Sequence, residues 1–130
     1  MYESETRGIR VRVTPTYLEE QSSPEDSEFF WAYTIDIANE SDDTVQLRSR
    51  VWRITDGQGQ TEEVRGPGVV GETPVIEPGA SYSYTSGCPL RTPSGIMVGS
   101  YQMIDGQGQM FDVAIPAFSL DSPFMVRSVN

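Results

Sequence analysis

The chain has 130 residues, which is the size of one domain, and a net charge of −10. Its apolar fraction of 37% is too high for a disordered chain. The negative charge disfavours nucleic acid, whose phosphates require a basic surface, and it equally disfavours insertion at an anionic membrane surface. We expect one acidic globular domain.

Histidine is absent, and Cys88 is the single cysteine. The absence of histidine removes the commonest general base and the commonest transition-metal ligand. The metal site that this composition can readily form is one for magnesium or calcium on oxygen ligands. Cys88 has no partner for an internal disulfide, the N-terminus lacks the apolar core of a signal peptide, and no apolar run approaches the roughly 20 residues of a membrane span. We expect a cytoplasmic protein without catalysis, metal site or cofactor.

The start of the chain is expected to be flexible and the rest to form strands. Residues 1–8 are polar and are expected to be a flexible N-terminal segment, followed by a single domain over 9–124 and a tail over 125–130. Residues 9–14 alternate apolar and polar side chains, as does the segment 29–39, and both patterns predict strands with one buried face. A polar loop is expected between them.

Residues 39–43 have the composition of a turn, and we expect them to join the strands on either side into a hairpin. In the strand 45–55 the apolar positions change parity, which predicts a bulge. Arg48 and Arg50 are expected on one face of this strand. They form either a solvated surface or, with Arg53 and Arg65, a patch that faces an anion.

The pentapeptide Asp-Gly-Gln-Gly-Gln occurs twice, at 56–60 and at 105–109. Asp and Gly favour tight hairpin turns, and two copies are too few for a solenoid, so we expect two hairpins of similar build. The spacing does not fit a calcium loop, which leaves an acidic metal turn as a weak alternative.

Residues 66–71 match the letters GxGxxG through Gly66, Gly68 and Gly71. A dinucleotide fingerprint requires a helix directly after the loop, but Pro74 and β-branched residues follow here. Pro67 also lacks the backbone donor that a phosphate nest would use. We therefore expect a glycine loop that crosses between sheets rather than a Rossmann motif.

The remaining segments continue the strand pattern. Residues 80–85 alternate, with Tyr82 and Tyr84 on one face, and a loop containing Pro89 and Pro93 is expected over 87–95. Residues 97–104 and 110–115 are expected to form the last hairpin, and Phe118, Leu120 and Phe124 to fasten the end of the chain. Cys88 is expected to pack in or near the core, with a reactive but non-catalytic thiol as the alternative. About seven short strands without helical periodicity predict an all-β, immunoglobulin-like β-sandwich.

Several separated motifs resemble the ApaG family, also called CorD. They are SRVWRITDGQGQTEEVRGPGVVGETPVIEPG, then YTSGCPL, TPSGIMVGSYQM and FDVAIPAF, and the resemblance covers residues 7–124. The resemblance implies a fibronectin type III-like sandwich. It also implies an association with cobalt resistance and magnesium efflux, and a gene that often neighbours the gene of a diadenosine tetraphosphate hydrolase. In eukaryotes the domain occurs in F-box proteins, which implies protein binding. It assigns no enzyme activity. Family members often carry histidine at the position of Val51.

Three functions are open at this point. The first is a non-enzymatic binding or adaptor domain that holds an unidentified protein partner through a sheet edge or the Gly66–Gly71 loop, with a homodimer as a further possibility. The second is a sensor for a nucleotide polyphosphate such as diadenosine tetraphosphate, held by Arg48, Arg50 and Arg65. The third, a hydrolase, is disfavoured by the missing general base.

Overall fold

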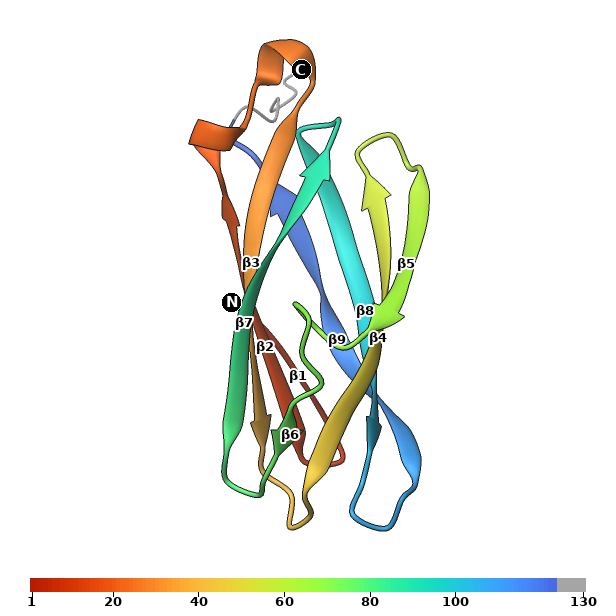
Figure 1. The fold of residues 1–130 in the computed structure, drawn as a ribbon. Helices are drawn as coiled ribbons and strands as arrows, with labels where there is room; N and C mark the ends of the chain where they lie inside the picture. The colour runs from red at the N-terminus through yellow and green to blue at the C-terminus, as the bar shows by residue number, and fades with distance from the viewer. Residues whose placement is uncertain (124–130) are drawn as a thin grey trace.

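The structure, a computed structural model that describes residues 1–123, is a sandwich of two antiparallel sheets (Figure 1). The first sheet contains, in spatial order, β1 (Tyr2–Thr6), β2 (Ile9–Tyr17), β3 (Phe29–Asn39) and β7 (Ser81–Leu90). The second contains β5 (Thr61–Pro67), β4 (Val45–Asp56), β8 (Ser94–Ile104) and β9 (Met110–Asp121), and β6 (Val75–Ile76) pairs with β4 beyond the end of β5. Two short 3₁₀ turns, η1 (Glu19–Gln21) and η2 (Pro24–Asp26), lie between β2 and β3.

The fibronectin type III-like, immunoglobulin-like sandwich predicted from the sequence is confirmed, with nine strands in the described residues rather than about seven. The additional strands are β1 and the two-residue β6. Across residues 1–123 there is no helix with the length and apolar character needed to span a membrane. The residues beyond 123, which include Phe124 and the expected tail 125–130, lie outside the described part.

The core forms where the inner faces of the two sheets meet. Every second residue of β2 from Ile9 to Val13 is fully buried, and β3 buries every second residue from Phe29 to Asn39, as the alternation predicted. The second sheet contributes residues such as Trp52, Tyr101 and Phe118, and the rings of Trp52 and Phe118 pack against Tyr33 of the first sheet. These aromatic side chains fill the centre of the sandwich.

The first residues of the chain form a strand, which corrects the expectation of a flexible segment. β1 pairs with β2 from Tyr2 opposite Val13 to Thr6 opposite Ile9. Side-chain bonds then tie it to the other sheet, since Ser4 Oγ donates to Ala114 O at 2.9 Å. The sequence YESET shows no apolar stripe, so its pairing depends on a neighbouring strand rather than on its own hydrophobicity.

The expected hairpin between β3 and β4 is wrong. β3 pairs with β2 and β7, whereas β4 belongs to the other sheet, so the connection 40–44 crosses from one sheet to the other. Asn39 stabilises this crossing. Its Nδ2 donates to Asp43 O and Ile76 O, both at 2.8 Å, and its Oδ1 accepts from the backbone N–H and the hydroxyl of Ser41.

The predicted bulge in β4 is confirmed. The register with β8 shifts between Leu47 and Ser49, so Arg48 is the extra residue. Before the bulge Leu47 faces the core, and after it Trp52 does. Arg50 shares the parity of Trp52 and therefore turns inward, while Arg48 is exposed. The expectation that Arg48 and Arg50 stand on one face is therefore wrong.

The two Asp-Gly-Gln-Gly-Gln segments form the hairpin turns β4–β5 and β8–β9, as predicted, and their hydrogen bonds match atom for atom. Asp56 Oδ1 accepts from the backbone N–H groups of Gln58 and Gln60 at 2.9 and 3.0 Å. Asp105 Oδ1 accepts from the equivalent Gln107 and Gln109, both at 2.9 Å. The two turns lie at opposite ends of the sandwich (Figure 1).

The two long sides of the sandwich differ. On one side β1 and β2 pack against β9, and we call this the closed seam. On the other side the edge strands β7 and β5 flank a gap between the sheets, and we call this the open seam (Figure 1). The segment 68–74, which joins β5 to β6, runs along the open seam. The candidate site lies there.

Candidate functional site: a cleft in the open seam

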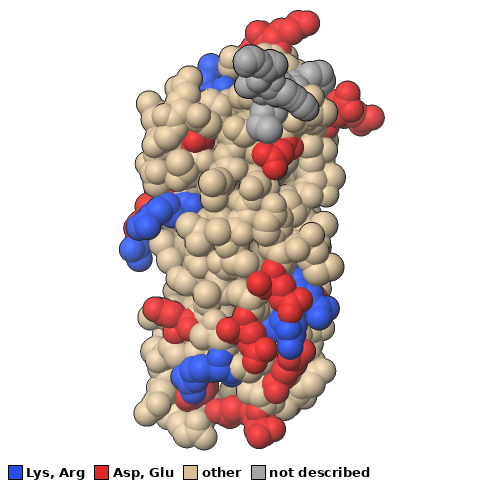
Figure 2. Space-filling model, turned by 180° about the vertical axis from the view of Figure 1, so that it is seen from behind, with Lys and Arg blue, Asp and Glu red and all other residues tan. Residues whose placement is uncertain are grey.

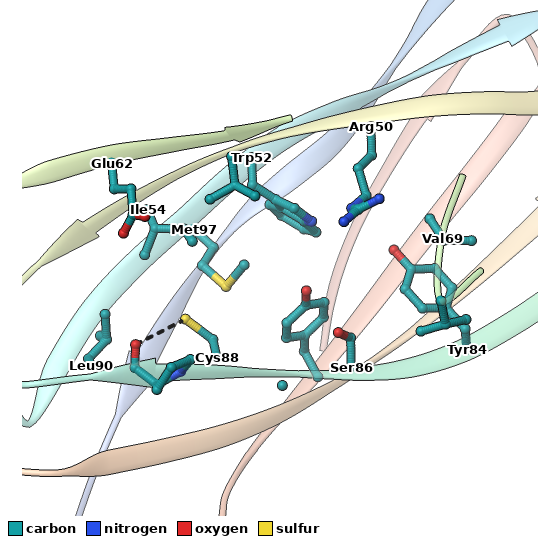
Figure 3. Close-up of a pocket in the computed structure, with 15 residues that line it drawn as sticks. Arg50, Trp52, Ile54, Glu62, Val69, Tyr84, Ser86, Cys88, Leu90 and Met97 are labelled. Atoms are coloured by element: carbon teal, nitrogen blue, oxygen red, sulfur yellow. Dashed lines mark hydrogen bonds between the residues drawn. The ribbon is translucent and has the colours of Figure 1, made fainter. Parts of the chain in front are cut away.

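A cleft of about 380 Å³ enters the sandwich through the open seam between β7 and β5. Tyr84, Ser86 and Cys88 point into it from β7, and β4 faces them from the other sheet (Figure 3). Most of the remaining wall is apolar. Its principal side chains are Trp52, Ile54, Val64, Val69, Leu90 and Met97, with Arg50 and Glu62 as the two charged ones.

Tyrosine hydroxyls lie at the Arg50 end of the cleft. The hydroxyls of Tyr84 and Tyr101 are hydrogen-bonded at 2.6 Å. Burial raises the pKa of Tyr84 and of Tyr101 above the ordinary value, as it does the pKa of Tyr33, and Arg50 only partly opposes this. These phenols therefore stay protonated at neutral pH and serve as neutral hydrogen-bonding groups.

Arg50 holds the glycine loop in place. Its Nη1 donates to Pro67 O at 3.0 Å and to Gly68 O at 2.9 Å. Gly66 makes room for the guanidinium, because a Cβ at Gly66 would lie only 3.0 Å from Nη1. Arg50 thus fixes the shape of the cleft wall and also places a positive charge in it.

The glycine loop does not cross between sheets, which corrects that expectation, because β5 and β6 both pair with β4. Gly68 has φ of +60°, and a Cβ there would lie 2.2 Å from Glu72 O, so only glycine fits. Val69 and Glu72 then exchange backbone hydrogen bonds across a tight turn with positive φ at Val70 and Gly71. Val69 enters the cleft wall as a result.

The predicted anion patch is assembled only in part: Arg50, Arg65 and Gly66 line one shallow pocket beside Asp112, whereas Arg48 and Arg53 are not among its lining residues. Arg48 is exposed at the bulge, and its carbonyl accepts from Gly68 N at 2.9 Å. Arg65 pairs with Val51 on the outer face of the sheet, and its Nε donates to Glu63 at 2.6 Å, while Arg53 lies 3.6 Å from the same carboxylate. Of the three proposed arginines, Arg50 alone reaches the cleft.

The outer edge of β7 presents unpaired backbone groups. The bond from Asn39 N to Ala80 O fixes the phase of the β3–β7 pairing, so every second residue of β7 points its N–H and C=O away from β3. Pro89, which has no N–H, occupies one of these positions, as the geometry allows. Within residues 1–123 no other strand pairs with this edge. The residues with outward N–H groups along the cleft are Ser83, Thr85 and Gly87.

Cys88 is 3% exposed, which confirms the expected packing role. Burial, with a smaller contribution from the Glu62 carboxylate, raises the pKa of its thiol to about 11. The neutral thiol therefore dominates near neutral pH, and it contributes a small apolar surface to the cleft.

The cleft does not follow from the sequence pattern, which predicts a strand that ends at 85 and a loop over 87–95. β7 instead runs to Leu90, and Ser86 and Cys88 continue the inward alternation begun by Tyr82 and Tyr84. The signal was present as small or apolar residues at every second position, but Pro89 suggested a break. Its edge location removes that conflict.

Several arginines elsewhere on the surface lie next to carboxylates. Arg10 contacts Glu3, Glu5 and Glu40, and Arg12 contacts Glu3. Figure 2, seen from behind, shows basic and acidic side chains lying next to one another on a mostly uncharged surface. That face offers no broad basic field of the kind that binds a phosphate backbone.

Comparison with known proteins gives the family. A family model described as the ApaG domain matches residues 19–105. Protein ApaG of Brucella anthropi is 61% identical over 130 residues, and that of Mesorhizobium japonicum 60% identical, each covering the whole of both chains. The crystal structure of the ApaA protein from Bordetella pertussis superposes with a TM-score of 0.87 at 42% identity, covering 96% of this chain and all of that one. The chain belongs to the ApaG family.

Proposed function

We propose that this ApaG protein is a non-enzymatic, cytoplasmic binding domain whose cleft in the open seam holds a segment of a partner protein. The observation that carries the proposal is the joint position of an apolar cleft and an unpaired strand edge on the same side of the sandwich. Binding sites for peptides combine these two elements, because backbone pairing supplies affinity and a side-chain pocket supplies selectivity.

The chemistry of the cleft supports binding rather than catalysis. Its phenols and its thiol have pKa values raised by burial, so they stay neutral and are poor nucleophiles near pH 7. The chain has no histidine to act as their base. A link to magnesium efflux or cobalt resistance, as the family resemblance implies, would then run through the bound partner.

A nucleotide polyphosphate sensor receives less support from this geometry. Arg50 and Arg65 line one pocket together, but Asp112 places a carboxylate in its wall, and Arg48 lies apart at the bulge. A polyphosphate needs several converging donors. Arg50 already donates from Nη1 to two carbonyls of the glycine loop.

The test is selection of a random peptide display library against the purified protein, with one variant in the cleft and one on the outer face of the first sheet. Ser86→Phe fills the cleft, whereas Thr34→Phe adds the same ring at an exposed position of β3. We expect peptides that bind the wild type and Thr34→Phe and lose at least about tenfold in affinity for Ser86→Phe. Failure to select any peptide, or equal binding to both variants, contradicts the proposal.

A further inference from the structure

The open seam specifies the conformation and the charge order of its partner, an inference that rests on the proposed binding function. We propose that the partner segment adds to the first sheet as an antiparallel strand beside β7. One apolar side chain enters the cleft opposite Ser86. Two residues before this anchor the segment carries a basic side chain, and two residues after it an acidic one.

The backbone of β7 dictates the strand conformation. The outward N–H and C=O groups of Thr85 and Gly87 flank Ser86, whose side chain points into the cleft. A segment whose residues face Thr85 and Gly87 with their own backbone groups therefore directs the residue between them inward. Pairing and side-chain insertion thus occur together only for an extended chain.

The middle of the cleft accepts an apolar side chain. Ser86 is the smallest of the three residues that β7 sends inward there, and Tyr33, its hydrogen-bonded partner on β3, lines the cleft beside it. Trp52 and Met97 face this part of the cleft from the opposite sheet. A branched aliphatic side chain fits these surroundings, and its burial removes apolar surface from water.

The two charged residues of the cleft lie at its opposite ends (Figure 3). Arg50 lies near Tyr84, and its positive charge lowers the pKa of that phenol against the effect of burial. Glu62 lies near Cys88, and its negative charge raises the pKa of that thiol. Tyr84 and Cys88 are the inward residues on either side of Ser86. The acidic side chain of the segment therefore belongs beside Tyr84, and the basic one beside Cys88.

The order of these charges defines the direction of the segment. β7 runs from Tyr84 toward Cys88, so an antiparallel segment meets Glu62 first and Arg50 last. Alternate residues of a strand lie about 6.6 Å apart on one face, which matches inward residues at spacings of two. The pattern is basic, any, apolar, any, acidic.

A foreign segment is a better occupant than a second copy of this chain. Two copies would bring two net charges of −10 together, and this repulsion opposes association. The acidic end of the seam, where Glu62 and Asp56 lie near Arg91, instead favours a basic residue from a different chain.

The first experiment uses two fluorescein-labelled heptapeptides of identical composition in a fluorescence-anisotropy titration. Thr-Lys-Thr-Leu-Thr-Glu-Thr has the proposed order, and Thr-Glu-Thr-Leu-Thr-Lys-Thr has the reverse order. We expect the first to bind about tenfold more tightly, and Glu62→Gln to reduce this preference. Equal affinities, or no binding of the first peptide at about 1 mM, overturn the inference.

The second experiment removes single N–H groups from the first peptide by N-methylation, which leaves the protein unchanged. Methylation of either threonine next to leucine should weaken binding about tenfold, because these N–H groups face β7. Methylation of leucine itself should have little effect, since its N–H points away from β7. Loss at every position, or at none, overturns the strand geometry.

The two proposals fail in distinguishable ways. If library peptides still require an open cleft at Ser86 but show neither the charge order nor the alternating effect of N-methylation, the binding function stands and the strand inference falls. If size-exclusion chromatography shows a dimer that the heptapeptide dissociates, the natural occupant of the edge is a second copy, which also overturns the inference.

Discussion

Asn39 is 1% exposed and makes four side-chain hydrogen bonds, three to the crossing 40–44 and one to Ile76 O in the other sheet. No local pattern in the sequence distinguishes it from the polar residues that follow it. Its position at the end of β3 places the carboxamide between Ser41 in the crossing and Ile76 in β6. A single amide thereby satisfies buried backbone groups that would otherwise lack partners.

Replacement of Asn39 with alanine should therefore lower the free energy of unfolding by about 3 kcal/mol, because Ile76 O and Ser41 N would lose their partners in a dry environment. Urea unfolding monitored by tryptophan fluorescence measures this. Asp42→Ala, at an exposed position in the same crossing, is the matched control and should be nearly neutral. Similar unfolding midpoints for both variants would show that the amide is dispensable.

Burial of the Cys88 thiol should make the folded protein less stable as the pH rises above about 9. The pKa of this thiol is about 11 in the folded protein against an ordinary value of 9.0, so between these values the unfolded thiol loses its proton while the folded one keeps it. Stability is full below about pH 9 and falls as the pH rises to about 11, by roughly 3 kcal/mol. The raised pKa values of Tyr84 and Tyr101 add a further fall in stability above about pH 10.

Cys88→Ala should lack the thiol part of this fall while keeping the tyrosine part. Urea midpoints of both proteins at about pH 8 and about pH 11 give the comparison. The variant is expected to start less stable and to lose less on the shift to high pH. Parallel loss in the two proteins would mean that the thiol titrates normally in the folded state.

At the scale of the element, the glycine loop combines two glycines with the same backbone region but different surroundings. Gly68 and Gly71 both have positive φ. A Cβ at Gly68 would clash with Glu72 O, whereas a Cβ at Gly71 would meet nothing within 4 Å. Glycine is therefore required at Gly71 by its backbone conformation alone, and at Gly68 by both conformation and lack of space.

Alanine at Gly71 should cost about 1 kcal/mol of stability, the strain of a left-handed residue. Alanine at Gly68 should cost about 2 kcal/mol more, because the loop must move away from Glu72 and Val69 must leave the cleft wall. Thermal unfolding of the two variants tests the difference. If they melt together, the close approach at Gly68 relaxes without cost.

The strands that the sequence analysis recognised share one property, which is that their inward residues are apolar in every second position. β2, β3 and the bulge in β4 follow from that pattern alone. β1 escaped recognition because Tyr2 is its one apolar residue, too few to form an alternating pattern. The cleft escaped because its walls come from β3, β4, β5, β7 and β8, and no local signal reports which distant strands meet.

At the scale of the whole molecule, the sandwich is held shut on one side and open on the other. Tyr2 contributes to the closed seam, where its ring lies 6.0 Å from that of Phe118 and its hydroxyl accepts from Ser119 N at 3.3 Å. The first residues of the chain therefore belong to the core architecture. The cleft opens on the opposite side of the sandwich.

Tyr2→Ala should lower stability by about 2 kcal/mol, since it removes a half-buried aromatic contact between the sheets. Glu5→Ala, on the outer face of the same strand, is the control and should change stability little. Chemical denaturation of both variants measures the effect. A Tyr2→Ala protein as stable as the control would mean that β1 does not contribute to closure.

The two Asp-Gly-Gln-Gly-Gln turns provide the molecule with an internal reference. Their backbone hydrogen bonds are the same, so the amide resonances of equivalent residues should report the same local conformation. The turn at 56–60 borders the acidic end of the open seam, whereas Gly106 in the other turn bonds to Asp43 at the far end. A ligand in the cleft should shift the amide resonances of the turn at 56–60, whereas temperature, salt and pH should shift those of both turns. The turn at 105–109 therefore serves as an internal control in the same spectrum.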